Sequence, residues 1–214
     1  ITGAMRNADD ISADGAGNIY AATIVALEPE SRNRGVLVVL NDTIHSAKWA
    51  HKSNTFSLQT FVSVNAGVQG LVVEGRAKYL SCAVSRKIYP LPAKAFPKIA
   101  VVQSYLDNDG QIIALVGKSE FDGVVIDGFG AGHVSFGMMD EIKKLKIPVV
   151  VSSRTGSGMC ATKTYGYKGS EIDLQSSGCV MSGWLSAIKA RLLLMILIAD
   201  EIPPQEIKNE FENF

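Results

Sequence analysis

The chain has 214 residues, of which 47% are hydrophobic and 20% are charged, and its 21 basic and 21 acidic side chains give a formal net charge of zero. This balance argues against a nucleic-acid or anionic-membrane partner, which would need a clustered basic face. Cys82, Cys160 and Cys179 have no metal-ligand spacing and are odd in number, so the sequence predicts neither a disulfide framework nor a zinc site. The most apolar run, residues 192–199, is shorter than the ~20 residues that cross a bilayer.

Residues 1–80 alternate between apolar and polar segments. The run Val36-Leu37-Val38-Val39-Leu40 is apolar without interruption, which is typical of a parallel strand covered on both faces. In chain order the sequence predicts the end of a buried strand at 1–2, a loop at 3–6, a helix at 18–27, a strand at 36–40, a polar loop at 41–54, a short helix at 56–61, and a hairpin of strands 70–73 and 77–80.

Residues 81–98 lack periodicity and contain three prolines, which predicts a linker between two domains. Beyond the linker, apolar strand patterns and helical patterns alternate. We expect strands at 99–102, 123–126, 148–151 and 179–181, and helices at 111–119, 135–145, 184–200 and 204–211. Alternation at this spacing predicts an α/β fold with a parallel, doubly wound sheet.

The stretch Asp127-Gly-Phe-Gly-Ala-Gly-His133 follows a predicted strand and precedes a predicted helix. Such a glycine-rich loop could cradle a phosphate at the helix N-terminus, and Arg154 after the next strand could accept the extra phosphate of NADP. However, the third glycine falls one residue early for the dinucleotide fingerprint. The sequence therefore favours a tight turn between strand and helix, with a phosphate- or NADP-binding domain as the alternative.

Polar residues in the other loops allow more than one interpretation. Lys52 is either a solvated surface lysine or a cation at the rim of an active site, where it would stabilise an anion or assist proton transfer. His45 and His51 lack a matching serine or aspartate and are expected at the surface. Glu171 and Asp173 lie in a segment rich in glycine and serine, where acids ordinarily keep a loop soluble. No nucleophile–base pair can be assembled from these residues alone.

Several blocks of the sequence occur together and span nearly the whole chain: TGAMR with ISADGAGNIYAA, RGVLVVLNDTI with AKWAHKSNTFSLQTF, PKIAVVQSY, FDGVVIDGFGAGH and VVVSSRTGSG. As an ordered set they resemble the bacterial-type L-asparaginase family. The pattern Lys-x-Asn-Thr-x-x-x-x-Thr-Phe, written here from Lys52 to Phe61, favours the periplasmic (type II) branch. That branch implies a periplasmic or secreted protein, with a cytoplasmic location as the alternative.

The resemblance implies that this chain corresponds to roughly the C-terminal two-thirds of a family member. The family motifs Thr-Gly-Gly-Thr and His-Gly-Thr-Asp-Thr, which carry the threonine nucleophile, do not occur in the 214 residues. The implied architecture is a partial N-terminal parallel-sheet domain at 1–80, a linker at 81–98 and a smaller doubly wound parallel-sheet domain at 99–214. The implied reaction is hydrolysis of L-asparagine to L-aspartate and ammonia, often with some activity on L-glutamine, and it needs no cofactor or metal.

We expect the chain alone to lack this activity, and a non-catalytic fragment or paralogue for binding or assembly is the alternative. By motif, Lys52 would hold ionised the aspartate of the absent second motif. The backbone carbonyl of Ala4 would face the substrate amide, and Glu171 would reach the substrate α-ammonium group. His133 stands where the family usually has Asn or Ser. The family habit is a homotetramer whose sites are shared between subunits.

Overall fold

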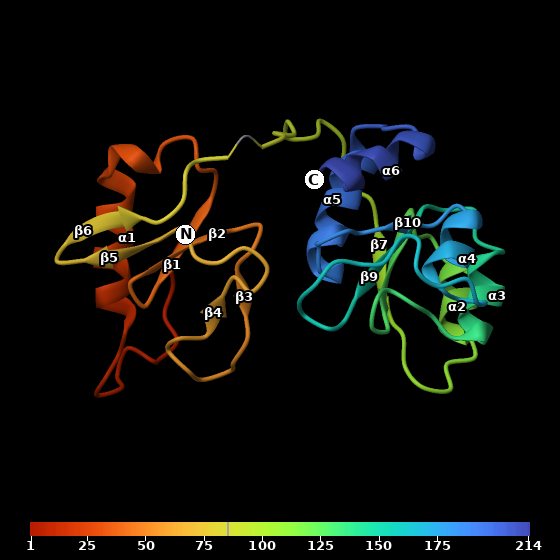
Figure 1. Ribbon diagram of the computed structural model, residues 1–214, viewed down its shortest axis with the longest axis horizontal. Coiled ribbons are helices and arrows are strands. Elements are labelled where there is room, and N and C mark those ends of the chain that lie inside the picture. Colours follow the sequence, from red (N-terminus) through yellow and green to blue (C-terminus); the bar gives the residue numbers. More distant parts are fainter. Residues whose placement is uncertain (85) are drawn as a thin grey trace. The chain divides into compact units, whose positions relative to one another are not determined.

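The computed structural model describes residues 1–84 and 86–214, and the chain forms two compact units, Ile1–Ser85 and Arg86–Phe214. Each unit combines helices with a β-sheet (Figure 1), which confirms the α/β class. The finer limits expected from the sequence, with 81–98 as a linker, stay predictions. In the described part of the chain, no helix has the length and apolar character that a membrane span requires.

The first unit has one long helix against a four-stranded antiparallel sheet. The sheet order is β1-β2-β5-β6, with β3 and β4 paired separately. The elements are α1 (Gly15–Leu27), the 3-10 turn η1 (Pro29–Ser31), β1 (Leu37–Leu40), β2 (Thr43–Ser46), β3 (His51–Lys52), β4 (Phe61–Val62), β5 (Gly70–Val73) and β6 (Arg76–Tyr79). Ala21 and Val25 of α1 pack on buried residues of the sheet such as Val39 and Val72, so α1 covers one of its faces.

The prediction that residues 36–40 form a parallel strand within a parallel sheet is wrong for the assigned strands of this unit. Leu40 pairs with Thr43, and Asn41 and Asp42 between them have positive φ values of 49° and 56°. Two residues in this conformation form the tight turn that joins antiparallel strands. The predicted polar loop 41–54 therefore contains β2 and β3, and the helix predicted at 56–61 is absent from the described structure.

The first residues of the chain make a parallel contact with β1 that the sequence analysis did not specify. The Ile1 amino group donates to Leu37 O at 2.8 Å, and Val39 N donates to Ile1 O at 2.9 Å. In a parallel pair, one residue bonds to two residues of the neighbouring strand that are two positions apart, as Ile1 does here with Leu37 and Val39. Residues 1–2 therefore run parallel to β1, and α1 follows them before the chain returns as β1.

The hairpin predicted around residues 74–76 is confirmed. Strands β5 and β6 pair antiparallel from Val73 with Arg76 to Gly70 with Tyr79. Their burial alternates, with Val72 and Ala77 facing the core. This period of two is the pattern of a sheet covered on one face.

The second unit is the longer in this chain, and its sheet is parallel with strand order β10-β9-β8-β7. The strands are β7 (Ile99–Gln103), β8 (Gly123–Gly128), β9 (Val149–Ser153) and β10 (Val180–Met181). The helices are α2 (Gln111–Lys118), α3 (Phe136–Ile142), α4 (Glu171–Ser176), α5 (Ala187–Ala199) and α6 (Pro204–Asn213). Figure 1 shows α2, α3 and α4 on one side of the sheet and α5 on the other, which confirms the doubly wound prediction.

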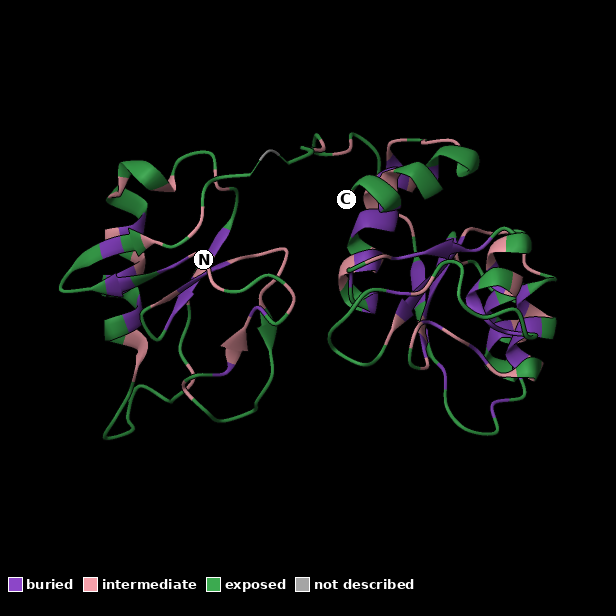
Figure 2. Cartoon of the chain, viewed as in Figure 1, coloured by how far each residue is buried: buried purple, intermediate pink, exposed green. Residues whose placement is uncertain are grey.

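The central strand β8 shows why the fold of the second unit could be predicted from the sequence. Val124 and Ile126 pack into the core that includes α2 and α3, whereas Val125 packs into the core that includes α5 and α6. Both faces of β8 are buried (Figure 2), so its central residues Val124, Val125 and Ile126 are all apolar. By contrast, the short helix α4 was not predicted, and residues 171–176 were taken for a loop.

Candidate functional site

The glycine-rich stretch after β8 folds back on itself as a tight turn. Phe129 N donates to His133 O at 2.8 Å, and His133 N donates to Phe129 O at 2.9 Å. Gly128 has no room for a side chain, because a Cβ atom there would lie 2.9 Å from the carbonyl oxygens of His133 and Ser152. The turn therefore places His133 at the carboxyl end of the parallel sheet, where ligands of α/β proteins bind.

Arg154, which we considered as a phosphate ligand, contacts its own chain. Its Nη1 donates to Ser104 O at 2.8 Å, and its guanidinium lies 4.6 Å from the centroid of the Phe129 ring. The helix after the turn, α3, is capped by Ser135 and does not begin at the glycines. The turn interpretation therefore agrees with the structure better than a phosphate cradle does.

Glu171 is the first residue of α4, and its side chain is 0% exposed. Its Oε1 accepts hydrogen bonds from the backbone N–H groups of Thr164 and Tyr165, both at 2.6 Å. Its Oε2 lies 2.9 Å from His133 Nε2. The interpretation of Glu171 as a solubilising loop residue is therefore wrong, because the carboxylate is buried and anchored.

The charge of Glu171 is maintained by its hydrogen bonds. Burial alone raises the pKa of the carboxyl, but the backbone N–H groups of Tyr165, Glu171 and Thr164, together with His133, lower it, and the net effect is a lowered pKa. An ionised carboxylate only accepts hydrogen bonds. His133 Nε2–H is therefore the donor in the hydrogen bond to Glu171.

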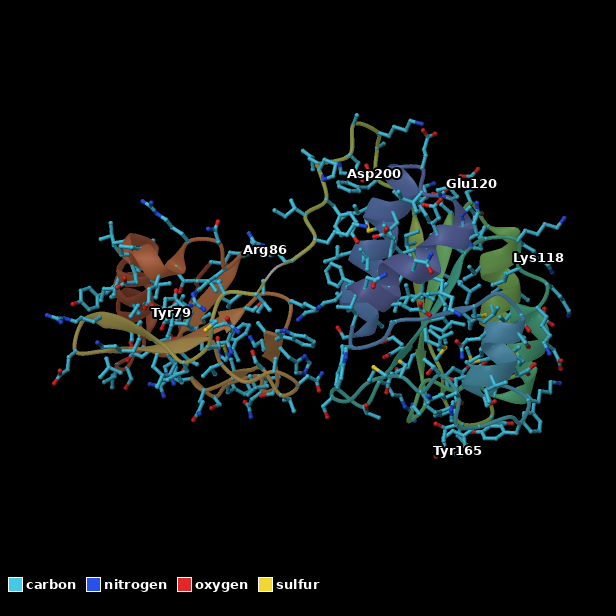
Figure 3. All side chains as sticks on the ribbon, turned by 45° about the horizontal axis from the view of Figure 1, so that its top comes forward. Tyr79, Arg86, Lys118, Glu120, Tyr165 and Asp200 are labelled. Atoms are coloured by element: carbon cyan, nitrogen blue, oxygen red, sulfur yellow. The ribbon has the colours of Figure 1, made fainter. Side chains whose placement is uncertain are left out.

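His133 is held on its other side by two tyrosines. Its Nδ1 lies 2.6 Å from Tyr167 Oη, and the rings of Tyr165 and Tyr167 meet it edge-on at centroid distances of 5.1 Å and 5.4 Å. Figure 3 shows Tyr165 at the end of the second unit opposite to Glu120 and Asp200. Glu120 precedes β8 in the chain, so this cluster lies toward the carboxyl ends of the strands.

In the first unit, the loop 3–6 is fixed by polar residues at the start of α1. Asp14 accepts hydrogen bonds from Met5 N and Arg6 N at 2.9–3.0 Å, and Asn18 Nδ2 donates to Gly3 O at 3.0 Å. Burial raises the pKa of Asp14, but the backbone N–H groups of Arg6 and Met5 outweigh this effect and lower it. Ala4 is exposed at the centre of this loop.

Lys52 precedes a loop that is stabilised by hydrogen bonds among its own residues. Ser53 N donates to Thr60 O at 2.8 Å, and Asn54 N donates to Thr60 Oγ1 at 3.0 Å. The Asn54 side chain accepts from Phe56 N at 2.8 Å, so the motif residues Asn54 and Thr60 serve the loop itself. Lys52 is exposed, and its approach to Ala4 and to substrate stays a prediction.

His45 is a buried residue that we expected at the surface, and that prediction is wrong. It lies on β2 with 1% of its surface exposed, and its Nδ1 is 2.9 Å from Ser63 Oγ. Burial lowers the pKa of its imidazole. His51 is exposed, as expected.

Comparison with known proteins places both units in one family. Residues 98–211 match the family model of the Glutaminase/Asparaginase C-terminal domain, and residues 1–84 match that of Asparaginase, N-terminal. The chain belongs to the asparaginase family. The resemblance inferred from the sequence blocks is therefore confirmed.

Three similar members of the asparaginase family are bacterial proteins. L-asparaginase 2 of Escherichia coli K12 is 33% identical, and the probable periplasmic L-asparaginase of Haemophilus influenzae is 31% identical; each alignment covers 100% of this chain and 62% of the relative. The glutaminase-asparaginase of Acinetobacter glutaminasificans is 26% identical, with 66% of its length covered. The chain thus spans less than two thirds of the length of these relatives.

The structure brings together two of the four residues that the asparaginase resemblance singled out. Glu171 and His133 form a direct hydrogen bond, which the sequence did not predict. Tyr165 and Tyr167 were missed, although the Tyr-Gly-Tyr sequence lies just before Glu171. Asp14 was missed as the anchor of the Ala4 loop.

Proposed function

We propose that this chain forms part of an amidohydrolase that converts L-asparagine into L-aspartate and ammonia, with L-glutamine as a secondary substrate. Relatives named L-asparaginase and glutaminase-asparaginase support this proposal. The observation that carries it is the Glu171 carboxylate, which is buried, accepts two backbone hydrogen bonds and lies toward the carboxyl end of the parallel sheet, with its pKa lowered by those hydrogen bonds. Such a group suits the α-ammonium of an amino-acid substrate.

In this proposal the chemistry begins on a threonine that the 214 residues do not include. Its hydroxyl attacks the side-chain amide carbon, ammonia leaves, and water then hydrolyses the ester to release L-aspartate. The developing oxyanion requires fixed donors. Lys52 holds a carboxylate of the absent motif ionised and assists proton movement, and the Ala4 carbonyl accepts a hydrogen bond from the substrate amide.

The proposed assembly is a homotetramer in which the first unit of one subunit and the second unit of its neighbour share a site. This arrangement would combine Ala4 and Lys52 with Glu171 and His133 of another copy. The name of the Haemophilus relative favours the periplasm as the compartment. Light scattering coupled to size-exclusion chromatography would test the oligomeric state.

The decisive experiment measures ammonia release from L-asparagine and L-glutamine. We would compare the 214-residue chain with a fusion that adds, before Ile1, the corresponding upstream segment of the Escherichia coli L-asparaginase 2. The chain alone should be inactive and the fusion active. In the fusion, Lys52→Met should lower kcat by roughly 100-fold or more, because proton-transfer and charge-stabilising groups contribute factors of that order.

The matched control is Lys78→Met, since Lys78 is an exposed lysine on β6 of the same unit, and it should leave kcat unchanged. Turnover by the chain alone would refute the requirement for an upstream threonine. A fusion whose activity is indifferent to Lys52→Met would remove Lys52 from the catalytic group.

A further inference from the structure

Three polar side chains of the second unit form a continuous hydrogen-bonded chain that ends on Glu171. Tyr167 Oη contacts His133 Nδ1 at 2.6 Å, and His133 Nε2 contacts Glu171 Oε2 at 2.9 Å. We call these residues the Tyr167–His133–Glu171 chain. They come from three places in the sequence: the turn after β8, the segment before α4, and the first residue of α4.

The two carboxylate oxygens of Glu171 are in different situations. Oε1 accepts two main-chain hydrogen bonds from Thr164 and Tyr165, which fix the plane of the carboxylate. Oε2 has His133 as its side-chain partner. A carboxylate oxygen can accept two hydrogen bonds, so Oε2 retains one place for a ligand ammonium group. Glu171 is 0% exposed, however, so a ligand can reach Oε2 only if the side chains that cover it move, and His133 is the one bonded to Oε2.

The His133 ring is confined by more than its bond to Glu171. Its side chain is only 12% exposed, and the rings of Tyr165 and Tyr167 contact it edge-on. The hydroxyl of Tyr167 is bonded to the second ring nitrogen. Since both nitrogens have partners, the imidazole cannot turn away from Glu171 without breaking the contact with Tyr167 as well.

We propose that Tyr167 is a specificity-determining residue that holds His133 over the Glu171 carboxylate, so that an α-ammonium ligand binds only after the imidazole is displaced. This inference rests on the proposed role of Glu171. The closed arrangement lowers the apparent affinity for an amino-acid ligand by the fraction of molecules in which the ring is open. Ligands that lack an amino group do not compete with His133 and are unaffected.

The test compares binding of L-aspartate with binding of succinate, which is L-aspartate without its amino group. Both would be titrated at one pH into the 214-residue chain, and the Cε1–H signal of His133 would be followed by NMR. Tyr167→Phe removes only the hydroxyl that holds the ring. It should lower the dissociation constant for L-aspartate roughly fivefold, which corresponds to about 1 kcal/mol for one lost hydrogen bond, and leave that for succinate unchanged.

Two further variants complete the series. His133→Asn removes the imidazole and should tighten L-aspartate binding at least as much as Tyr167→Phe does; here the two ligands are followed by backbone amide signals. Tyr105→Phe is the matched control, because Tyr105 is an exposed tyrosine of the same unit outside the Tyr167–His133–Glu171 chain, and it should change neither dissociation constant. In the ligand-free Tyr167→Phe protein, 15N relaxation should show a more mobile His133 ring.

Each outcome decides the proposal. Weaker L-aspartate binding in His133→Asn would show that the imidazole is itself a ligand contact, and unchanged binding in Tyr167→Phe would show that its hydroxyl does not hold the ring; either result overturns the inference. A His133→Asn chain with no preference for L-aspartate over succinate, or no binding of either, overturns it together with the role of Glu171. Because ammonia release is measured separately, an active fusion with unaltered binding in both variants would refute this inference alone.

Discussion

The two units of this chain hold their candidate site residues in different ways. In the first unit, Ala4 and Lys52 are exposed and lie on or next to loops that are fixed by main-chain hydrogen bonds to Asp14 and Thr60. In the second unit, Glu171 is fully buried and linked to other side chains. The first unit thus leaves its groups exposed, whereas the second encloses its acid, and a change to the acid should cost the second unit more stability.

The largest effect that we expect is for Glu171→Ala. It leaves the N–H groups of Thr164 and Tyr165 and His133 Nε2 without their acceptor and opens a cavity. We expect a loss of about 3 kcal/mol in the unfolding free energy of the second unit, with no change in the first. Hydrogen exchange resolved by residue would measure each unit separately.

Glu120→Ala is the control for Glu171→Ala, because the Glu120 side chain is 93% exposed, and its effect should stay within about 0.5 kcal/mol. Equal losses in both units after Glu171→Ala would mean that they unfold together. The contrast between an enclosed and an open site would then have no energetic basis.

The same contrast explains what the sequence predicted and what it missed. Strand β8 was predictable because its alternate residues pack into two cores, which leaves an unbroken apolar run. The similar run in β1 was misread as part of a parallel sheet, because nothing in its own residues shows that Asn41 and Asp42 adopt the turn to β2. The hydrophobic pattern of a segment can indicate a strand, whereas the direction of its pairing depends on the segments that lie beside it in the fold.

Glu171 shows the corresponding limit for the site. Its sequence surroundings are polar, and its partner His133 lies 38 residues away, so no local pattern indicates burial. The family resemblance singled out both residues but treated them as separate ligand contacts. Only the fold shows that they bind each other.

Acid should weaken the first unit at a higher pH than the second. Burial lowers the pKa of His45 below its ordinary value of 6.5, so below that pH the unfolded chain takes up a proton that the folded unit does not. As the pH is lowered below 6.5, the unfolding free energy of the first unit should therefore decrease, by at most about 1.4 kcal/mol per pH unit, until the pKa of folded His45 is reached.

Glu171 acts in the same sense but at a lower pH, since its folded pKa lies below the ordinary value of 4.5. Its contribution to the second unit is present above that value and is lost only as the pH falls through the folded pKa. Lowering the pH from 7 to 5 should thus destabilise the first unit alone, as measured by hydrogen exchange. His45→Gln should flatten that dependence and the exposed control His51→Gln should not; a first unit insensitive to pH in this range would contradict the burial effect.

The smallest expected effect concerns the hairpin turns that, among the described residues, join sheet strands in the first unit and not in the second. Glu74 and Gly75 join β5 to β6 with positive φ values of 51° and 69°, a conformation that a glutamate disfavours and an asparagine tolerates. Glu74→Asn should therefore raise the unfolding free energy of the first unit by about 0.5 kcal/mol, as measured by denaturant titration with hydrogen exchange. Lys78→Asn introduces the same residue at an extended position of the hairpin, where asparagine is a poor strand former, so it should lower stability instead. A gain in both variants would show that the gain does not depend on the turn conformation, and the left-handed backbone at Glu74 would then carry no measurable strain.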